Sequence, residues 1–336
     1  MNRKFLLLLI LLTVIIPAST YSLHWLPPPG IIISGHSCSP DYLEIKIDAF
    51  VEDITRYNIY RDTLPMFYRH HYDSTHNFIG HIETDSMYFR DYFTDTLLHP
   101  SGSNGVCNPN INYYYIATSI DIIAGTELES QRPSNCVGEF DTKLYRGINW
   151  ISYALDIGVR DAGEFASLIP GTSRLNGWDN IGQVWKVIAR LSGFPPPSRW
   201  LSCDTVAVSY MYQAFIPSVT ESLFTLAVPG LVPSEDPHFS LKRGRNYITL
   251  PYKEQVVNRL TTGIEFGQAI GYPPANRIMA WDAENQSYQI VARYIGYPPP
   301  AHWINGSEEW SNVRPGFPYM VECIDDRWEL WPPISR

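Results

Sequence analysis

The stretch Trp178–Trp200 (WDNIGQVWKVIARLSGFPPPSRW) recurs without a gap at Trp281–Trp303 (WDAENQSYQIVARYIGYPPPAHW), with 10 identical residues in 23. A second stretch, Arg146–Ser152 (RGINWIS), returns 97 residues later as Arg243–Thr249 (RGRNYIT). The C-terminal half therefore contains two copies of one unit. Tandem duplication of an aromatic unit punctuated by glycine and proline is typical of binding and structural arrays, whereas an enzyme usually assembles one set of catalytic residues.

Each copy predicts a small α+β unit. A strand follows the Gly-x-Asn motif, and a helical segment comes next, at 160–169 in the first copy and 254–270 in the second. A hairpin then turns at Asp179–Gly182 or Asp282–Asn285, and further strands close the unit. One helix packed on a small antiparallel sheet is an α+β arrangement. The polar, proline-containing stretch 229–238 is expected to join the copies.

The segment before the copies reads as short strands. In Tyr42–Phe50 (YLEIKIDAF), apolar and charged residues alternate with a period of two, which predicts a strand with one buried face. Seven strands are expected, at residues 31–34, 42–50, 57–61, 77–83, 87–93, 112–121 and 126–136. Many short strands joined by polar turns predict a β-sandwich.

Two parts of the chain resemble known families. Tyr57–Arg61 (YNIYR) and Tyr113–Asp121 (YYYIATSID), the latter followed by Gly125 and Glu127, resemble the third and sixth strands of a fibronectin type III domain in the variety found in bacterial exported proteins. The copies resemble tandem Gly-x-Asn-x-Ile-Ser modules that follow such domains in bacterial secreted proteins. Together these resemblances imply a mainly β protein, with an N-terminal seven-stranded antiparallel sandwich followed by two α+β repeat modules. They imply a spacer or protein-binding role and no catalytic residue.

The first 22 residues have the features of a secretory signal peptide. Arg3 and Lys4 precede the apolar run Phe5–Ile16, and small residues follow it. An apolar run of 12 residues is shorter than the roughly 20 that span a bilayer, so no membrane span is expected in the mature chain. The expected organisation is a signal peptide at 1–22, a sandwich at 23–142, and repeat modules at 143–233 and 239–336.

Charge and motifs limit the functional classes. Loss of the two basic leader residues changes the formal net charge from −9 to −11, which disfavours binding to nucleic acid. The chain contains no GxSxG, HExxH, GxxxxGK[ST] or GxGxxG motif. We therefore expect no enzyme, no metal and no cofactor. The expected location is secreted or cell surface.

The repeated aromatic residues are the candidate ligand-binding residues: Trp178, Trp200, Trp281 and Trp303. Their recurrence suits stacking platforms for sugar rings, and it equally suits a repeated hydrophobic core. The expected function is a non-catalytic binding, adhesion or structural protein with an extracellular protein or glycan as partner. The alternatives are a carbohydrate-binding accessory protein that uses these aromatics and, less favoured, an enzyme of unknown type.

The five cysteines, Cys38, Cys107, Cys136, Cys203 and Cys323, all lie in the mature chain, so at least one stays outside an intramolecular disulfide. If the last two expected sandwich strands form a hairpin, Cys107 just before it and Cys136 at its end approach each other. The rival partner for Cys136 is Cys38. A Cys107–Cys136 bridge would contribute about 3–4 kcal/mol in the chain-entropy model.

Peptide mapping of the mature protein under non-reducing conditions tests this pairing. We expect a peptide pair that joins Cys107 to Cys136 and disappears on reduction. A Cys38–Cys136 pair would contradict the hairpin argument and leave Cys107 unpaired.

Overall fold

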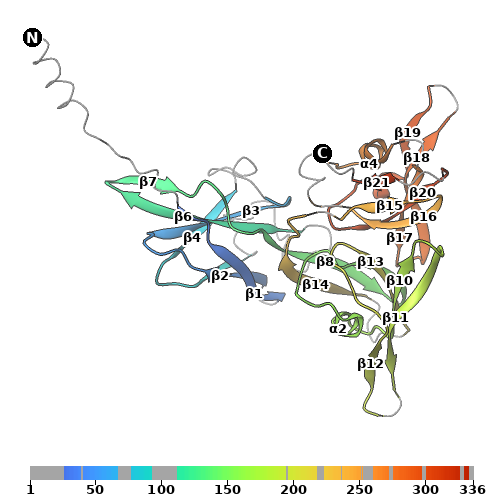
Figure 1. The fold of residues 1–336 in the computed structure, drawn as a ribbon, viewed down its shortest axis with the longest axis horizontal. Coiled ribbons are helices and arrows are strands. Elements are labelled where there is room, and N and C mark those ends of the chain that lie inside the picture. The colour runs from blue at the N-terminus through green and yellow to red at the C-terminus, as the bar shows by residue number, and fades with distance from the viewer. Residues whose placement is uncertain are drawn as a thin grey trace, which may run out of the picture.

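The structure, a computed structural model, is mainly β, as the sequence predicts, and its strands form antiparallel sheets (Figure 1). It describes residues 26–38, 41–66, 77–92, 112–193, 196–217, 223–235, 237–250, 252, 260–271, 275–296, 300–325 and 329–332. The expected signal peptide and Cys107 lie outside these residues.

The N-terminal region forms two sheets. One has the order β1-β2-β5, from β1 (Gly30–Cys38), β2 (Asp41–Ala49) and β5 (Tyr88–Tyr92). The other has the order β14-β8-β6-β3-β4, with β7 paired to β6. Its strands are β3 (Arg56–Asp62), β4 (Phe78–Glu83), β6 (Tyr114–Ile123), β7 (Thr126–Glu129), β8 (Val137–Tyr145) and β14 (Leu223–Leu231).

The alternating pattern of β2 explains how these two sheets share a core. Ile45 and Ile47 point to the buried face and contact Ile59 and Tyr115 of the second sheet, all in one hydrophobic cluster. A charge pair also lies between the sheets, where Arg61 Nη1 is 2.6 Å from Asp91 Oδ2. The Tyr115 hydroxyl donates to the same carboxylate at 2.9 Å, so this buried charge is hydrogen-bonded.

The strand expected at 126–136 is interrupted, which corrects the sequence analysis. β7 ends at Glu129, and β8 begins only at Val137. Between them, Ser134 bonds to Ala117 of β6 in place of a regular strand ladder. Its backbone N–H donates to Ala117 O at 2.7 Å, and its hydroxyl accepts from Ala117 N at 2.8 Å. Pro133, which has no N–H to donate, lies in this interruption.

Strands β8 and β14 connect the N-terminal region to the first copy (Figure 1). Tyr114 and Tyr115 of β6 pair with the first residues of β8, whereas all of β8 pairs with β14. The expected domain boundary at residue 142 therefore falls inside β8. Pro229, expected in the connection between the copies, belongs to β14, which tolerates proline because it is an edge strand.

The two copies form five-stranded sheets with the same strand order. The first is β12-β11-β10-β13-β9, with β9 (Gly147–Ser152), β10 (Arg174–Asp179), β11 (Val184–Ser192), β12 (Arg199–Ser202) and β13 (Met211–Ile216). The second is β19-β18-β17-β20-β16, with β16 (Gly244–Thr249), β17 (Ala275–Asp282), β18 (Ser287–Ile295), β19 (His302–Asn305) and β20 (Pro318–Cys323). A short pair, β15 (Phe239–Leu241) with β21 (Glu329–Trp331), flanks the second sheet.

Among the described residues a helix covers each sheet, α2 (Ala162–Ser167) in the first copy and α4 (Gly263–Ile270) in the second. α2 is shorter than the expected segment 160–169, and residues 254–259 of the segment expected at 254–270 lie outside the described residues. Asp161 caps α2, and Thr262 with Glu265 forms a capping box on α4, so side chains fix both starts. A 3₁₀ turn, η2 (Glu308–Trp310), follows β19. None of the helices in the described ranges is long and apolar enough to cross a membrane.

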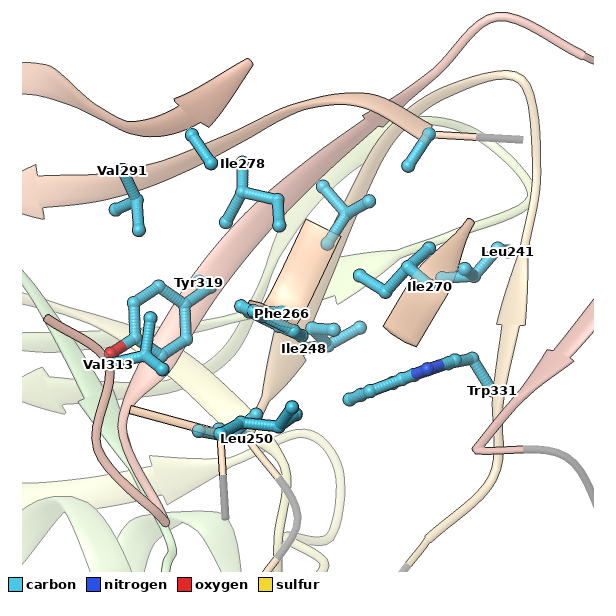
Figure 2. Packing of buried hydrophobic residues seen from close by; sticks show 14 of the residues in the cluster. Leu241, Ile248, Leu250, Phe266, Ile270, Ile278, Val291, Val313, Tyr319 and Trp331 are labelled. Atoms are coloured by element: carbon cyan, nitrogen blue, oxygen red, sulfur yellow. The ribbon is translucent and has the colours of Figure 1, made fainter. Parts of the chain in front are cut away.

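The core of the second copy lies between α4 and its sheet (Figure 2). Phe266 of α4 is fully buried, with its ring centroid 5.4 Å from Tyr319 and 5.3 Å from Trp331. Trp303 packs against the same helix at Gly267, where an added Cβ would collide with the indole ring. The absence of a side chain at position 267, and likewise at Gly263 opposite Val291, lets the helix approach the sheet this closely.

Substitution Gly267→Ala tests this close approach. The added methyl group would overpack the core and should lower the free energy of unfolding by about 1–3 kcal/mol, although alanine has a better helix propensity than glycine. Chemical denaturation measures the change. Gly296→Ala is the matched control, because a Cβ there meets no atom within 4 Å. Equal stability of the two variants would contradict the packing.

Candidate functional site at the interface of the copies

In the hairpin turns of both copies, an aspartate side chain accepts a hydrogen bond from the backbone N–H three residues later. Asp179 Oδ1 accepts from the backbone N–H of Ile181 at 2.9 Å and of Gly182 at 3.0 Å. Asp282 Oδ1 accepts from the backbone N–H of Asn285 at 3.0 Å. These turns, in which an aspartate caps the chain two or three residues on, explain why both copies keep the aspartate after tryptophan.

Both turn aspartates are held ionised. The Lys186 ammonium, 2.5 Å from Asp179, and the turn N–H groups lower the pKa of Asp179 to about 2. Burial alone would raise the pKa of Asp282, but hydrogen bonds from Asn285 and Gln289 outweigh it and leave the pKa below its usual value. Neither carboxylate is therefore suited to act as a general acid at neutral pH.

The residue after each turn reaches across to the other copy. Gln286 Oε1 accepts from the backbone N–H of Ile148, and Gln183 Oε1 accepts from the backbone N–H of Arg245, both at 2.7 Å. Both glutamines have a positive φ, 51° for Gln183 and 49° for Gln286. The contact is reciprocal, as in a two-fold symmetric dimer, but both halves belong to one chain.

The Gly-x-Asn motif is the receiving side of this contact. Gly147 and Gly244 have φ of 107° and 99°, and a Cβ at either would lie 2.5 Å from the amide oxygen of the facing glutamine. Asn149 and Asn246 hold the motif in shape. Each side chain bonds both the N–H and the C=O of the residue four positions earlier, at 2.7–2.9 Å.

Aromatic rings from both copies fill the interface. We call this set the inter-copy cluster: Trp150, Trp178, Trp185, Tyr247, Trp281 and Tyr288. The ring centroids of Trp150 and Tyr247, which hold equivalent positions, are 5.1 Å apart at the centre. Trp281 stacks on Trp150 at 5.7 Å, and Trp178 meets Tyr247 edge-on at 4.5 Å. The copies thus bury a shared aromatic layer instead of two separate surfaces.

The symmetry of the cluster is incomplete at the indole nitrogens. Trp281 Nε1 donates to Ile148 O at 2.7 Å. Trp178 Nε1 is buried and has no hydrogen-bond partner among the described residues. The Trp281 side is therefore the better satisfied half of the interface.

The four predicted ligand-binding tryptophans separate into two pairs. Trp178 and Trp281 meet in the inter-copy cluster, where both are half-buried. Trp200 and Trp303 lie away from it, against the helices of their own copies, and Trp303 is only 6% exposed. The structure therefore does not bring the four rings together on one surface.

Two equivalent grooves flank the inter-copy cluster. The β17–β18 groove, of about 820 Å³, is bounded by the second copy's hairpin and by Thr142, Lys143, Tyr145 and Trp150 of the first copy's side. The β10–β11 groove, of about 720 Å³, is bounded by the first copy's hairpin and by the matching strands of the second copy. Both volumes lie in the range of about 300–1,000 Å³ that is usual for small-ligand sites.

The linings of the two grooves have diverged. Position 284 of the β17–β18 groove is Glu, where the β10–β11 groove has Ile181, and Asn285 also lines the β17–β18 groove. The β17–β18 groove also contains Trp310 from η2, whereas Trp178 is the single tryptophan among the described residues that line the other. Sequence reasoning missed these residues because it followed identity between the copies. The positions at which the two copies differ were the signal that could have identified these groove residues.

The β17–β18 groove joins the copies through a side-chain hydrogen bond as well. The Tyr145 hydroxyl donates to Glu284 Oε2 at 3.2 Å, and partial burial together with this carboxylate raises the pKa of Tyr145. At the other wall, Arg314 lies over the ring of Phe317 at 4.3 Å, and desolvation lowers its pKa. The groove therefore presents charges of both signs beside aromatic rings.

Cys136, Cys203 and Cys323 form no disulfide with one another. Burial raises the pKa of the Cys136 thiol to about 12, whereas Cys203 is exposed. Because Cys107 lies outside the described residues, the Cys107–Cys136 bridge stays a prediction.

Comparisons with known proteins found no match: no protein-family model matches the chain, and no curated protein was found to match it. No three His, Cys, Asp or Glu side chains in the described ranges are grouped so that they could hold a metal ion.

Substitution Trp281→Ala tests whether the cluster holds the copies together. Loss of the stacked ring and of its hydrogen bond to Ile148 should lower the free energy of unfolding by about 3–5 kcal/mol. Thermal and chemical unfolding measure it. Ile181→Ala, at a side chain 82% exposed, is the control and should change stability by less than about 0.5 kcal/mol. A Trp281→Ala protein of normal stability would mean that this ring is free for another role.

Proposed function

We propose that this chain is an exported, non-catalytic binding protein whose ligand site is formed jointly by the two copies. The observation that carries the proposal is the β17–β18 groove. Its walls come from segments that are about 140 residues apart in sequence, such as β8 with Tyr145 and the β17–β18 turn with Glu284, and reciprocal contacts hold them in place. Binding sites are commonly found where two structural units meet.

The N-terminal region supports a presenting role in this proposal. Its two facing antiparallel sheets share one core, which agrees with a fibronectin type III-like sandwich acting as a spacer. Strands β8 and β14 continue that sheet into the first copy, so the sandwich can hold the groove in a fixed orientation. The signal-peptide features of residues 1–22 support export and a secreted or cell-surface location.

The chemistry of the groove supports binding more than catalysis. Asp282, its most buried carboxylate, is committed to its own turn, and Glu284 accepts from Tyr145. Aromatic rings and side-chain amides make up about half of the remaining lining residues. The repeated tryptophans are largely used in packing, because Trp303 is buried and Trp178 and Trp281 belong to the inter-copy cluster. The groove is therefore a better candidate for the binding site than the four tryptophans taken together.

The test is a screen of the mature protein on arrays of glycans and of extracellular proteins. The variant pair Lys143→Ala/Glu309→Ala removes one exposed side chain from each wall of the β17–β18 groove. Its affinity for the best array ligand should fall by about tenfold or more. The control pair Ile181→Ala/Asp204→Ala, in the β10–β11 groove, should stay within about twofold.

Two results would overturn the proposal. One is a mature protein that binds nothing on either array. The other is a ligand whose affinity is the same for the wild type and for both variant pairs, because its site would then lie outside the grooves.

A further inference from the structure

We propose that the β17–β18 groove binds a neutral oligosaccharide. The inference rests on the proposed function and names the ligand class of that site. Three features of the lining carry it, namely an aromatic surface, uncommitted neutral polar groups and a small net charge.

The aromatic surface comes from Trp310 and Trp281. Trp310 ends η2, packs against the core of the second copy and also lines the groove, so its ring is held on a supported element. Trp281 lines the same groove and is fixed by its stacking on Trp150. Indole rings that are held rigidly give a flat apolar surface that matches the C–H face of a pyranose ring.

The polar groups suit sugar hydroxyls, which must find hydrogen-bond partners when they leave water. The exposed side chains of Ser307 and Asn312 line the groove and make no hydrogen bond within the described residues. A serine hydroxyl and an asparagine amide each offer both a donor and an acceptor, as a sugar hydroxyl does. They lie on either side of Trp310 in sequence, so the polar and aromatic contacts come from one short segment.

The charges of the groove disfavour an ionic ligand. Glu284 and Glu309 bring two negative charges, and Lys143 and Arg314 bring two positive ones. Asp282 adds a third carboxylate, whose oxygens accept hydrogen bonds within its turn, so the lining has a formal net charge of −1. With the net charge of −9 on the chain, an acidic glycan would be repelled, while the two cations offset the attraction for a basic peptide.

The β10–β11 groove provides an internal control for this reasoning. It has the same frame of hairpin, turn aspartate and facing strands, and a similar volume. Its exposed aromatic residue is Tyr210, 42% exposed, and Ile181 stands where the other groove has Glu284. A ligand that depends on the segment around Trp310 should therefore choose one groove of the two.

The experiment is isothermal titration of the mature full-length protein with cellohexaose, chitohexaose, xylohexaose and mannohexaose. We expect saturable binding of at least one of them, with one site per chain. Trp310→Ala should weaken it by about tenfold or more, and Trp310→Phe, which keeps a ring, should weaken it less. Asn312→Ala, at an exposed side chain, should also weaken it without changing the unfolding temperature. Tyr210→Ala, in the other groove, should stay within about twofold.

The outcomes separate this inference from the function on which it rests. If none of the four hexasaccharides binds while a protein on the array binds through the β17–β18 groove, the ligand class is wrong and the proposed function stands. If neither sugars nor array proteins bind, both fail. Sugar binding that Tyr210→Ala weakens as much as Asn312→Ala does would also overturn the assignment to this groove.

Discussion

The structure of the C-terminal half depends on one reciprocal contact between the copies. Gln183 and Gln286 each insert an amide oxygen above the glycine of the facing Gly-x-Asn motif. Because this contact needs a positive φ and no Cβ at the receiving position, glycine is required there. These two hydrogen bonds are exposed, and the aromatic cluster beside them buries the apolar part of the same interface. A local sequence motif thus serves a long-range interface.

The same half is tied to the N-terminal region through a second shared core. One hydrophobic cluster contains residues of all three parts: Tyr60 and Tyr114 of the N-terminal region, Phe140 of β8, and Leu155 and Tyr252 of the two copies. The rings of Tyr114 and Tyr252 are 5.8 Å apart. The described units are therefore joined by buried apolar contacts and a continuous sheet, which limits independent motion of the units.

Duplication with divergence explains how a symmetric frame acquires one distinctive groove. The frame needs the turn aspartates, the glutamines and the central aromatics, and both copies keep these residues. The positions between them face the grooves, and apart from the Tyr145–Glu284 hydrogen bond they lie outside the contacts that both copies share. There Glu284 and Ile181 differ without cost to the pairing of the copies. Positions that differ between the copies therefore include groove-lining residues, whereas the turn aspartates and glutamines that join the copies are the same in both.

Much of the local structure could be predicted from the sequence alone. Alternation in Tyr42–Phe50 predicted β2, the aspartates predicted the hairpin turns, and internal identity predicted two units of one kind. These features depend on neighbouring residues, for which periodicity and turn chemistry suffice. The strand expected at 126–136 was too long, because serine contacts to β6 compete with regular pairing there.

Only the tertiary structure decided what the repeated residues do. From sequence, Trp178, Trp281, Trp200 and Trp303 were equal candidates, since recurrence suits a platform and a core alike. The fold places two of them between the copies and two beneath the helices. It also extends β8 across the expected boundary, because the unpaired side of the strand is completed by β14 from far along the chain. Such contacts join residues about 100 positions apart, and no local pattern encodes which surfaces meet.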